Sequence, residues 1–497
     1  NLNPSNTFWA KPYRLFSQID TEAERYLEFD RWWSAPFYMT RQEMDWIVQN
    51  LFVGNRLSRA ELPDPTTDGL INPRNIRSPI VVFASAGDNI TPPAQALNWI
   101  LDLYKDEEDL RLHEQVIVYN IHQSTGHLGI FVSATVANRE HSTLFNVLDL
   151  IELLPPGLYE ACIEDLHPDL PFVELVEGRH TIRFESRSFE DLRAFDDGRE
   201  DEKAFEVVER VSQVNQHVYD LAVSPLVRQV STAWSAQALR LLHPKRVSRY
   251  SWSSLNPVAL AVMPLAAQAK AQRQPILGPN LFSDMEQWFS ESMVRGWDTY
   301  RDIRDQSIEV AFQQIYGAPW LRALLGLDNS HMPSQYLLDR DVALQNELKA
   351  LRKQVSYLQI NQGDSAAALA RILIYMAEKS SFVDERAFNL LKRLSQEQVQ
   401  GCQLPSLDKL KATLREQWSV MQQYPEEAIA AIPKLVPSAQ QRQLIWNAVA
   451  EIAELHDLNN ASEAIQTRFA TIACALGLCS AWQPTKKKAT KRRRSVK

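Results

Sequence analysis

The chain has 497 residues, which is more than one hydrophobic core organises, so we expect about three folding units. Hydrophobic residues make up 45% and charged residues 23%, a composition that excludes wholesale disorder. No apolar run approaches the ~18 residues that cross a bilayer, so no membrane span is expected. The net charge of −8 hides an asymmetry, because residues 486–497 carry eight Lys or Arg and no acid. The remainder is therefore strongly acidic, which argues against general nucleic-acid binding.

The cysteines and the first residues bear on location and completeness. Cys162, Cys402, Cys474 and Cys479 are scattered without metal-ligand spacing, which favours a reducing cytosol and gives no metal or cofactor site. The chain opens Asn1-Leu2-Asn3-Pro4, with no Met and no signal peptide. A bulky Asn would normally keep an initiator Met before it. We therefore expect that the protein is cytoplasmic and that this chain begins in the middle of a longer protein.

Residues 1–79 are rich in aromatic side chains and helical in pattern. Trp9, Trp32, Trp33, Trp46 and Phe52 fall in this region. Two interpretations stay open. The aromatic side chains could pack helices together in a core, or the region could be a cap or lid that lines an apolar substrate channel.

Two apolar runs follow, at 79–84 and 115–121, and both read as buried strands. Between them, residues 94–103 have a helical pattern opened by two prolines. A buried strand, a helix and another buried strand predict a βαβ unit of a parallel sheet within residues 80–160. The run 129–132 leads into a further helix.

Residues 161–330 are predicted to be mostly helical with one short β ribbon. The ribbon falls at 171–187, with alternating apolar residues on either side of a Glu-Gly turn. Helices are expected at about 200–220, 229–242, 258–273 and 281–316, with Pro and Gly breakers between them.

Residues 331–480 are predicted to form a helical bundle separable from the sheet, and this makes the fold class α/β followed by all-α. Residues 337–358 carry apolar residues at heptad spacing, interrupted at Asp341. This stripe could form a homodimer, although packing inside the bundle is the favoured interpretation. The basic tail, 481–497, is expected to be disordered. It could contact a polyanion, or it could only aid solubility.

The strongest chemical signal is an Asp and a His that each follow one of the two parallel strands. Asp88 lies just after the first strand, and His127 lies just after the second. Because loops at the carboxyl ends of parallel strands form the ligand crevice, we expect a carboxylate–imidazole pair there. Such a pair fixes the imidazole tautomer and stabilises the imidazolium formed when His takes a proton from a nucleophile. His122 is interpreted as a support residue.

These motifs resemble those of a known family. Gly87-Asp88-Asn89-Ile90-Thr91-Pro92-Pro93 and Gly126-His127-Leu128-Gly129-Ile130-Phe131-Val132-Ser133 resemble the acid and base motifs of poly(3-hydroxyalkanoate) synthases. That resemblance covers about residues 1–140. Over nearly its whole length the chain is more closely similar to an uncharacterised bacterial family labelled poly(3-hydroxyalkanoate) synthetase-like, for example at 45–55, 154–160 and 224–228.

The resemblance implies an α/β-hydrolase fold in which a Cys-His-Asp triad attacks an acyl ester or acyl-CoA thioester. Asp88 would be the triad acid and His127 the base. Residues 80–160 would then be the last strands of the hydrolase sheet, and residues 1–79 its cap. The chain departs from the family at one point, since it contains no Gly-x-Cys-x-Gly or Gly-x-Ser-x-Gly elbow and no Cys before Asp88. The nucleophile and the oxyanion-hole amide after it are expected on a preceding segment.

A second resemblance concerns the helical region. Residues 363–386 look like part of a tellurite-resistance-type helical domain whose acidic residues have been associated with metal. The candidates here are Asp364, Asp384 and Glu385. We interpret them as an ordinary solvated helix face and predict no metal site.

Two functions therefore remain open at the level of sequence. The chain is either the C-terminal portion of an acyl ester or thioester enzyme, or a non-catalytic scaffold built on a degenerate hydrolase half. An elbow motif encoded just upstream of these residues would favour the enzyme.

Overall fold

A computed structural model describes residues 3–33, 39–127, 129–167, 172–176, 178–195, 202–251, 253, 255–274, 278, 280–327, 342–377, 384–399, 402–455 and 463–480. The chain divides into two compact units. The helical unit consists of residues 1–55 and 199–333, and the sheet unit consists of residues 56–198 and 334–497. Residues 1–79, which we expected as one region, are thus shared between the two units.

The helical unit contains a 36-residue helix, α16 (Leu281–Tyr316), whose bounds are those predicted from the sequence. Asn280 caps its start, since the Asn280 side chain accepts hydrogen bonds from the N–H groups of Phe282 and Ser283. The predicted helices near 200–220, 229–242 and 258–273 are also present. The remaining elements are η1 (Asn6–Ala10), α1 (Lys11–Ser17), α2 (Ile19–Trp33), α3 (Arg41–Ile47), η2 (Val48–Phe52), α11 (Glu202–Val218), η6 (Tyr219–Val223), α12 (Ser224–Val230), α13 (Ala233–Leu241), α14 (Pro244–Ser251), α15 (Pro257–Gln272) and α17 (Pro319–Leu324).

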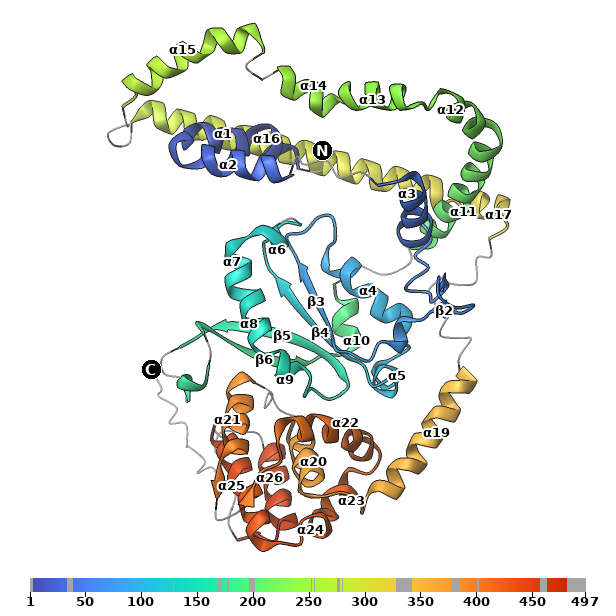
Figure 1. Ribbon diagram of the computed structural model, residues 1–497, viewed down its shortest axis with the longest axis vertical. Coiled ribbons are helices and arrows are strands. Elements are labelled where there is room, and N and C mark those ends of the chain that lie inside the picture. Colours follow the sequence, from blue (N-terminus) through green and yellow to red (C-terminus); the bar gives the residue numbers. More distant parts are fainter. Residues whose placement is uncertain are drawn as a thin grey trace, which may run out of the picture. The chain divides into compact units, whose positions relative to one another are not determined.

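The N-terminal helices pack along α16 (Figure 1). The Trp9 indole N–H donates to Ser290 Oγ at 3.0 Å, and the Trp9 ring meets Phe289 edge-on at 5.5 Å between centroids. This supports helix packing as the role of Trp9. Trp32, Trp46 and Phe52, by contrast, are exposed.

The sheet unit is built on four strands in the order β3-β4-β5-β6. Their bounds are β3 (Ile80–Ser85), β4 (Val116–His122), β5 (Gly157–Asp165) and β6 (His180–Ser186). The first three strands are parallel and β6 is antiparallel to β5. The predicted βαβ unit is confirmed, because α4 (Pro93–Leu103) and α5 (Glu107–Leu112) connect β3 to β4.

The predicted β ribbon at 171–187 was wrong in its first half. Residues Val173–Leu175 form a short 3₁₀ helix, η5, and β6 pairs instead with β5, about twenty residues upstream in the chain. No strand was predicted at 157–165, where Pro155 and Pro156 precede the strand and acidic residues interrupt its alternation. The other short elements of this part are β1 (Leu62–Pro63), β2 (Leu70–Ile71), η3 (Pro73–Asn75), α6 (Gly129–Val132), α7 (Ala134–Val136), η4 (Ala137–His141), α8 (Ser142–Asn146), α9 (Leu148–Ile151) and α10 (Phe189–Arg193).

Each face of the sheet has its own hydrophobic core. Ile117 and Tyr119 of β4 point to a cluster shared with α4 and α10, whereas Val116 and Val118 point to a cluster on the other face. This alternation follows from the two-residue period of a strand. The second cluster continues without interruption into the C-terminal helices. The C-terminal helices therefore share a core with the sheet. They are not a separate domain of the kind expected from the sequence.

The C-terminal part of the sheet unit is helical, as predicted, apart from one two-stranded ribbon. It comprises α19 (Val342–Gln359), α20 (Ser365–Ala377), α21 (Glu385–Gln396), β7 (Gln398–Val399), β8 (Cys402–Gln403), α22 (Leu407–Gln423), α23 (Pro425–Ala430), α24 (Ile432–Leu435), α25 (Ala439–Leu455) and α26 (Glu463–Ala475). Cys474 and Cys479 form a disulfide at the end of α26, a pairing that the interpretation of the cysteines as residues of a reducing cytosol did not anticipate.

The heptad stripe lies on α19, which packs against α22. Ser356 contacts Ser419 there, with 2.8 Å between the two hydroxyl oxygens. Leu351, Val355 and Leu358 are more than half exposed, so the bundle does not bury the stripe. Packing within the bundle was therefore the wrong choice for these residues, and the homodimer stays a prediction. Leu337 and Asp341 lie outside the described residues.

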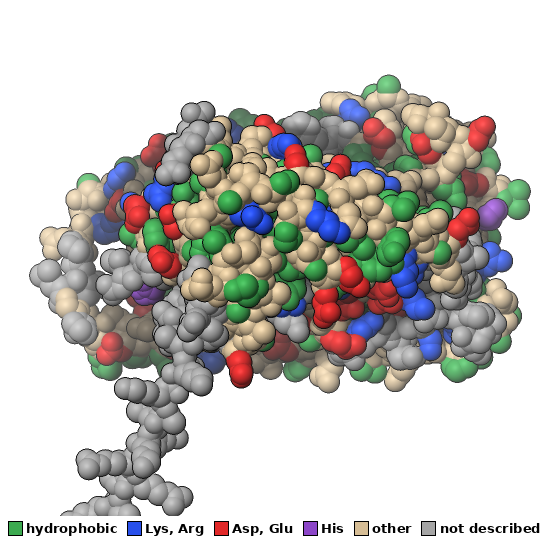
Figure 2. Space-filling model, turned by 90° about the horizontal axis from the view of Figure 1, so that it is seen from below, with side chains coloured by type: hydrophobic (Ala, Val, Ile, Leu, Met, Phe, Trp, Pro, Cys, Tyr) green, Lys and Arg blue, Asp and Glu red, His purple; other side chains and the backbone are tan. Residues whose placement is uncertain are grey.

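Among the described residues, no helix has both the length and the apolar character needed to cross a bilayer. On the face shown in Figure 2, Lys and Arg side chains are scattered among acidic and apolar ones rather than gathered in one area. The basic tail at 481–497 lies outside the described residues, so its predicted contact with a polyanion rests on its sequence.

Candidate functional site

Asp88 and His127 meet at the carboxyl end of the parallel strands. Ser85, the last residue of β3, is opposite His122, the last residue of β4. The loops that leave these two strands are therefore neighbours. His127 Nδ1 lies 2.9 Å from Asp88 Oδ2, so the structure brings together the two residues singled out from the sequence. Their catalytic role remains a prediction.

Asp88 is held as a carboxylate. It is 1% exposed, and its oxygens accept hydrogen bonds from Ile90 N at 2.8 Å, Thr91 N at 3.1 Å and Thr91 Oγ1 at 2.7 Å. Burial by itself would raise the pKa of Asp88, but the hydrogen bonds from Thr91, Ile90 and His127 together outweigh it and lower the pKa to about 2. An ionised Asp88 fixes the proton of His127 on Nδ1.

The other nitrogen of His127 is then the basic one. With Nδ1–H donating to Asp88, Nε2 carries the lone pair that can accept a proton. The His127 side chain is 34% exposed, whereas that of Asp88 is fully buried. A partly exposed imidazole that a buried carboxylate orients through Nδ1 is the arrangement of a general base with its orienting acid.

His122 supports the loop that carries His127. His122 Nδ1 accepts hydrogen bonds from Ser124 N at 3.2 Å and from Thr125 N at 3.0 Å. A neutral His122 therefore has its proton on Nε2, opposite to His127. Nε2 lies 3.8 Å from Glu140 Oε1, on the π-helical turn η4. These contacts agree with the supporting role inferred from the sequence.

Close contact between the two loops depends on Gly87. A Cβ atom at this position would lie 2.5 Å from the backbone carbonyl carbon and oxygen of Ser124. Backbone atoms cannot give way as a flexible side chain can. Two residues before Gly87, the buried Ser85 hydroxyl donates a hydrogen bond to the carbonyl oxygen of His122 at 3.1 Å. Any side chain at position 87 would therefore push apart the loops that hold Asp88 and His127.

Thr91 and Glu140 belong to this site, and the sequence did not single them out. Thr91 was detectable in principle, because an Asp side chain in a turn accepts hydrogen bonds from groups just after it, and Thr91 lies three positions after Asp88. Glu140 was not, since it lies 18 positions beyond His122 on a helix whose orientation depends on packing. Glu140 is 4% exposed, and its Oε2 atom has no hydrogen-bond partner among the described residues.

Cys162, the free thiol nearest in sequence to this region, is not a suitable nucleophile. It lies on β5, where burial, with Glu185 and Glu160 nearby, raises the pKa of the thiol to about 11. The thiol is thus protonated at neutral pH, and the thiolate is the reactive form. Cys162 also follows His127 in the chain, whereas the nucleophile of an α/β-hydrolase precedes the acid and the base.

The three acidic residues considered for a metal are engaged in protein contacts. Asp364 pairs with Lys409 at 2.5 Å, and Asp384 pairs with Arg386 at 2.7 Å. Asp384 and Glu385 are buried, so the interpretation as a solvated helix face was wrong for both. Within the described part of the chain, no three His, Cys, Asp or Glu residues lie together as a metal site would require.

The fold and the site define a mixed α/β protein with a carboxylate–imidazole pair at the carboxyl ends of its strands. Residues 1–359 match a family described as "Protein of unknown function (DUF3141)", and the chain belongs to this family. It is also 40% identical over 461 residues to the "Uncharacterized protein in ackA 5'region" of Rhizobium meliloti. That match covers 91% of this chain and 62% of the relative, so the chain spans about three fifths of the relative's length. No solved structure matches.

Proposed function

We propose that the chain is the C-terminal portion of an α/β-hydrolase-fold enzyme that acts on an acyl ester or an acyl thioester. In this proposal Asp88 and His127 are the acid and base of a triad whose nucleophile lies outside the 497 residues. The observation that carries the proposal is the 2.9 Å contact between His127 Nδ1 and a fully buried Asp88 carboxylate.

The sheet offers a place for the remaining part of such an enzyme. β3 stands at the edge of the described four-stranded sheet, and it is an apolar, parallel strand. Parallel strands normally lie inside sheets, because exposed edges pair readily with other strands. The loop with Asp88 leaves this edge strand, so a strand added beside β3 would end close to His127. The greater length of the Rhizobium relative is in keeping with further strands.

The chemistry follows from the orientation of His127. As the nucleophile attacks the acyl carbonyl, its proton passes to His127 Nε2, and Asp88 stabilises the imidazolium that forms. His127 then returns the proton to the leaving alcohol or thiol as the bond from the carbonyl carbon to that group breaks. Water, or a hydroxyl group of a growing polyester, takes up the acyl group in the second half of the reaction.

Covalent labelling tests this proposal. An N-terminally extended form of the protein would be treated with a fluorophosphonate and, separately, with iodoacetamide, and the modified peptide would be identified by mass spectrometry. We expect rapid labelling of one Ser or Cys outside the 497 residues, and we expect His127→Ala to slow it at least a hundredfold. Labelling that maps inside the 497 residues, or that is indifferent to His127→Ala, would contradict the proposal.

A scaffold is the second candidate, favoured by the core shared between the sheet and the C-terminal helices. In that case the sheet serves to hold the helices. No residue of the extended protein would then react with either reagent faster than an ordinary exposed side chain.

A further inference from the structure

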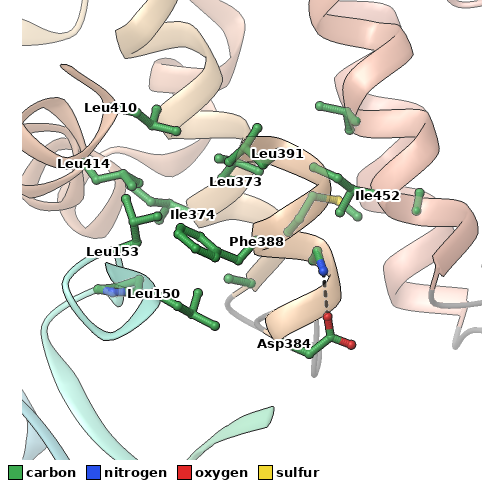
Figure 3. Close-up of a pocket in the computed structure, with 16 residues that line it drawn as sticks. Leu150, Leu153, Leu373, Ile374, Asp384, Phe388, Leu391, Leu410, Leu414 and Ile452 are labelled. Atoms are coloured by element: carbon green, nitrogen blue, oxygen red, sulfur yellow. Dashed lines mark hydrogen bonds between the residues drawn. The ribbon is translucent and has the colours of Figure 1, made fainter. Parts of the chain in front are cut away.

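An apolar cavity lies within the sheet unit, far from Asp88 and His127. It has a volume of about 90 Å³ and opens between α20, α21, α22 and α25 and the segment that leads into β5. Figure 3 shows Leu150 and Leu153 from that segment facing Ile374, Phe388, Leu414 and Ile452 from the helices. Each of these six side chains is at least nine-tenths buried.

The lining of the cavity is apolar, with one exception that is already engaged. Among the residues that the structure describes, Asp384 is the only charged one that lines it. Asp384 Oδ1 accepts a hydrogen bond from Ala387 N at 2.8 Å, drawn in Figure 3, and Oδ2 accepts one from Arg386 Nη2 at 2.7 Å. A buried water needs two to four polar partners, and this lining does not supply them. The cavity is therefore suited to an apolar occupant.

The volume limits the size of that occupant. An engineered apolar cavity of ~150 Å³ stays dry and binds benzene or xenon. The present cavity has about six-tenths of that volume, so it suits a group smaller than a benzene ring. A charged or hydroxylated group of the same size would lose its hydration without gaining a partner.

The topology separates this cavity from the proposed catalytic site. Leu150, Leu153 and Pro155 come just before β5, whose first residue, Gly157, donates its N–H to Gln115 O at 2.9 Å. Gly157 thus lies at the start of β4, whereas His127 follows the end of β4. Some six residues of strand, or roughly 20 Å, lie between the two ends. An occupant of the cavity does not reach His127.

We propose that this cavity is a binding site for a small neutral hydrocarbon group, such as a short alkyl chain, distinct from the proposed acyl-transfer site. Its lining comes both from the C-terminal helices and from the segment before β5. A bound group contacts both parts and therefore stabilises their packing, because a ligand that binds only the folded state shifts the equilibrium towards it.

The test uses the full 497-residue chain with labelled isoleucine methyl groups and three probes. Xenon and propane are the two apolar probes. Ethanol is the polar control, and it has the same number of heavy atoms as propane. We expect xenon and propane to shift the NMR signals of the Ile374 and Ile452 methyl groups saturably, and we expect ethanol to leave them in place. Unshifted methyl signals with both apolar probes would overturn the proposal, as would equal shifts with ethanol.

Variants locate the effect. Ala453→Leu on α25 fills the cavity and should abolish the shifts, and Ala387→Val on α21 does the same should the first variant fail to fold. Ala412→Leu adds the same atoms on the exposed side of α22 and should bind xenon like the parent chain. Shifts that survive in a folded cavity-filling variant would place the binding elsewhere and refute the proposal.

Discussion

Folding stabilises the charged form of Asp88. The free energy of unfolding should therefore depend on pH through this residue. The pKa of Asp88 is about 2 in the folded chain against an ordinary value of 3.8. A carboxyl group with a lowered folded-state pKa stabilises the fold above its unfolded-state pKa, and this contribution is lost as the pH falls through the folded-state pKa. The contribution from Asp88 should therefore be present above pH 4 and disappear towards pH 2.

We expect Asp88→Asn to lower the free energy of unfolding by about 2 kcal/mol at pH 7, since each pKa unit corresponds to ~1.4 kcal/mol. The difference from the parent chain should shrink between pH 4 and pH 2. Urea denaturation across this pH range measures it. Asp68→Asn, which alters an exposed carboxylate, is the control and should change stability by only a few tenths of a kcal/mol. A difference that persisted at pH 2 would argue against a charged Asp88.

The two histidines of the site should hold opposite tautomers. His127 is held with its proton on Nδ1 by Asp88, and His122 is held with its proton on Nε2 because its Nδ1 accepts two backbone hydrogen bonds. Two-bond proton–nitrogen NMR spectra distinguish these forms at neutral pH. Asp88→Asn should release His127 and leave His122 unchanged. The same tautomer at both positions would contradict the described geometry.

Single residues at the site were predictable to different degrees. Asp88 and His127 follow strands that are readable as apolar runs, so their proximity follows from the parallel order of those strands. Gly87 and Thr91 lie in the same motif, but their roles appear only once the Ser124 backbone and the Asp88 carboxylate are in place. Glu140 is brought to His122 by a turn of π-helix, whose occurrence is not encoded in apolar periodicity.

At the scale of elements, Arg371 on α20 holds several helices together. It is fully buried, and desolvation lowers the pKa of its guanidinium to about 10. The guanidinium donates to Gln417 Oε1 at 2.7 Å, Ile360 O at 2.7 Å and Ala428 O at 3.1 Å. These acceptors lie on α22, at the end of α19 and on α23. One side chain therefore satisfies polar groups from three neighbouring elements.

We expect Arg371→Met to lower the free energy of unfolding by about 3 kcal/mol or more, because several buried acceptors lose their donor at once. Arg371→Lys should recover only part of this loss, since an ammonium group cannot span all of these directions. Chemical denaturation followed by circular dichroism measures both effects. Arg415→Met, on the exposed surface of α22, is the matched control. A loss below 1 kcal/mol in Arg371→Met would show that water replaces the guanidinium.

Elements with local signals were predictable, and those with long-range partners were not. The bounds of α16 follow from an Asn cap at 280 and a Gly at 317, both adjacent to the helix. Strand β5 lacks such a signal, because its two faces belong to different cores and its pattern is mixed. The partner of β6 was misassigned for the same reason, since strand pairing depends on sequence-distant residues.

At the scale of the whole molecule, the core shared by the sheet and the C-terminal helices bears on whether those helices can fold without the sheet. Residues 331–480 were predicted to fold as a separable domain, but their apolar cluster includes Val116, Val118 and Phe184 of the sheet. Removing the sheet would expose that face to water, which costs roughly 25 cal/mol for each Å² of apolar surface. The sequence could not show this, because periodicity reveals an apolar face but not the partner that covers it.

In the function proposed for this chain, His127, oriented by Asp88, serves a nucleophile supplied from outside these residues. The most direct measurement is the hydrolysis of 3-hydroxyacyl thioesters by the 497-residue chain, by an N-terminally extended form and by that form with His127→Ala. We predict turnover only by the extended form with His127 intact, because the triad and the oxyanion-hole amide are complete only there. Turnover that persists after His127→Ala, or an inert extended protein, would contradict the account.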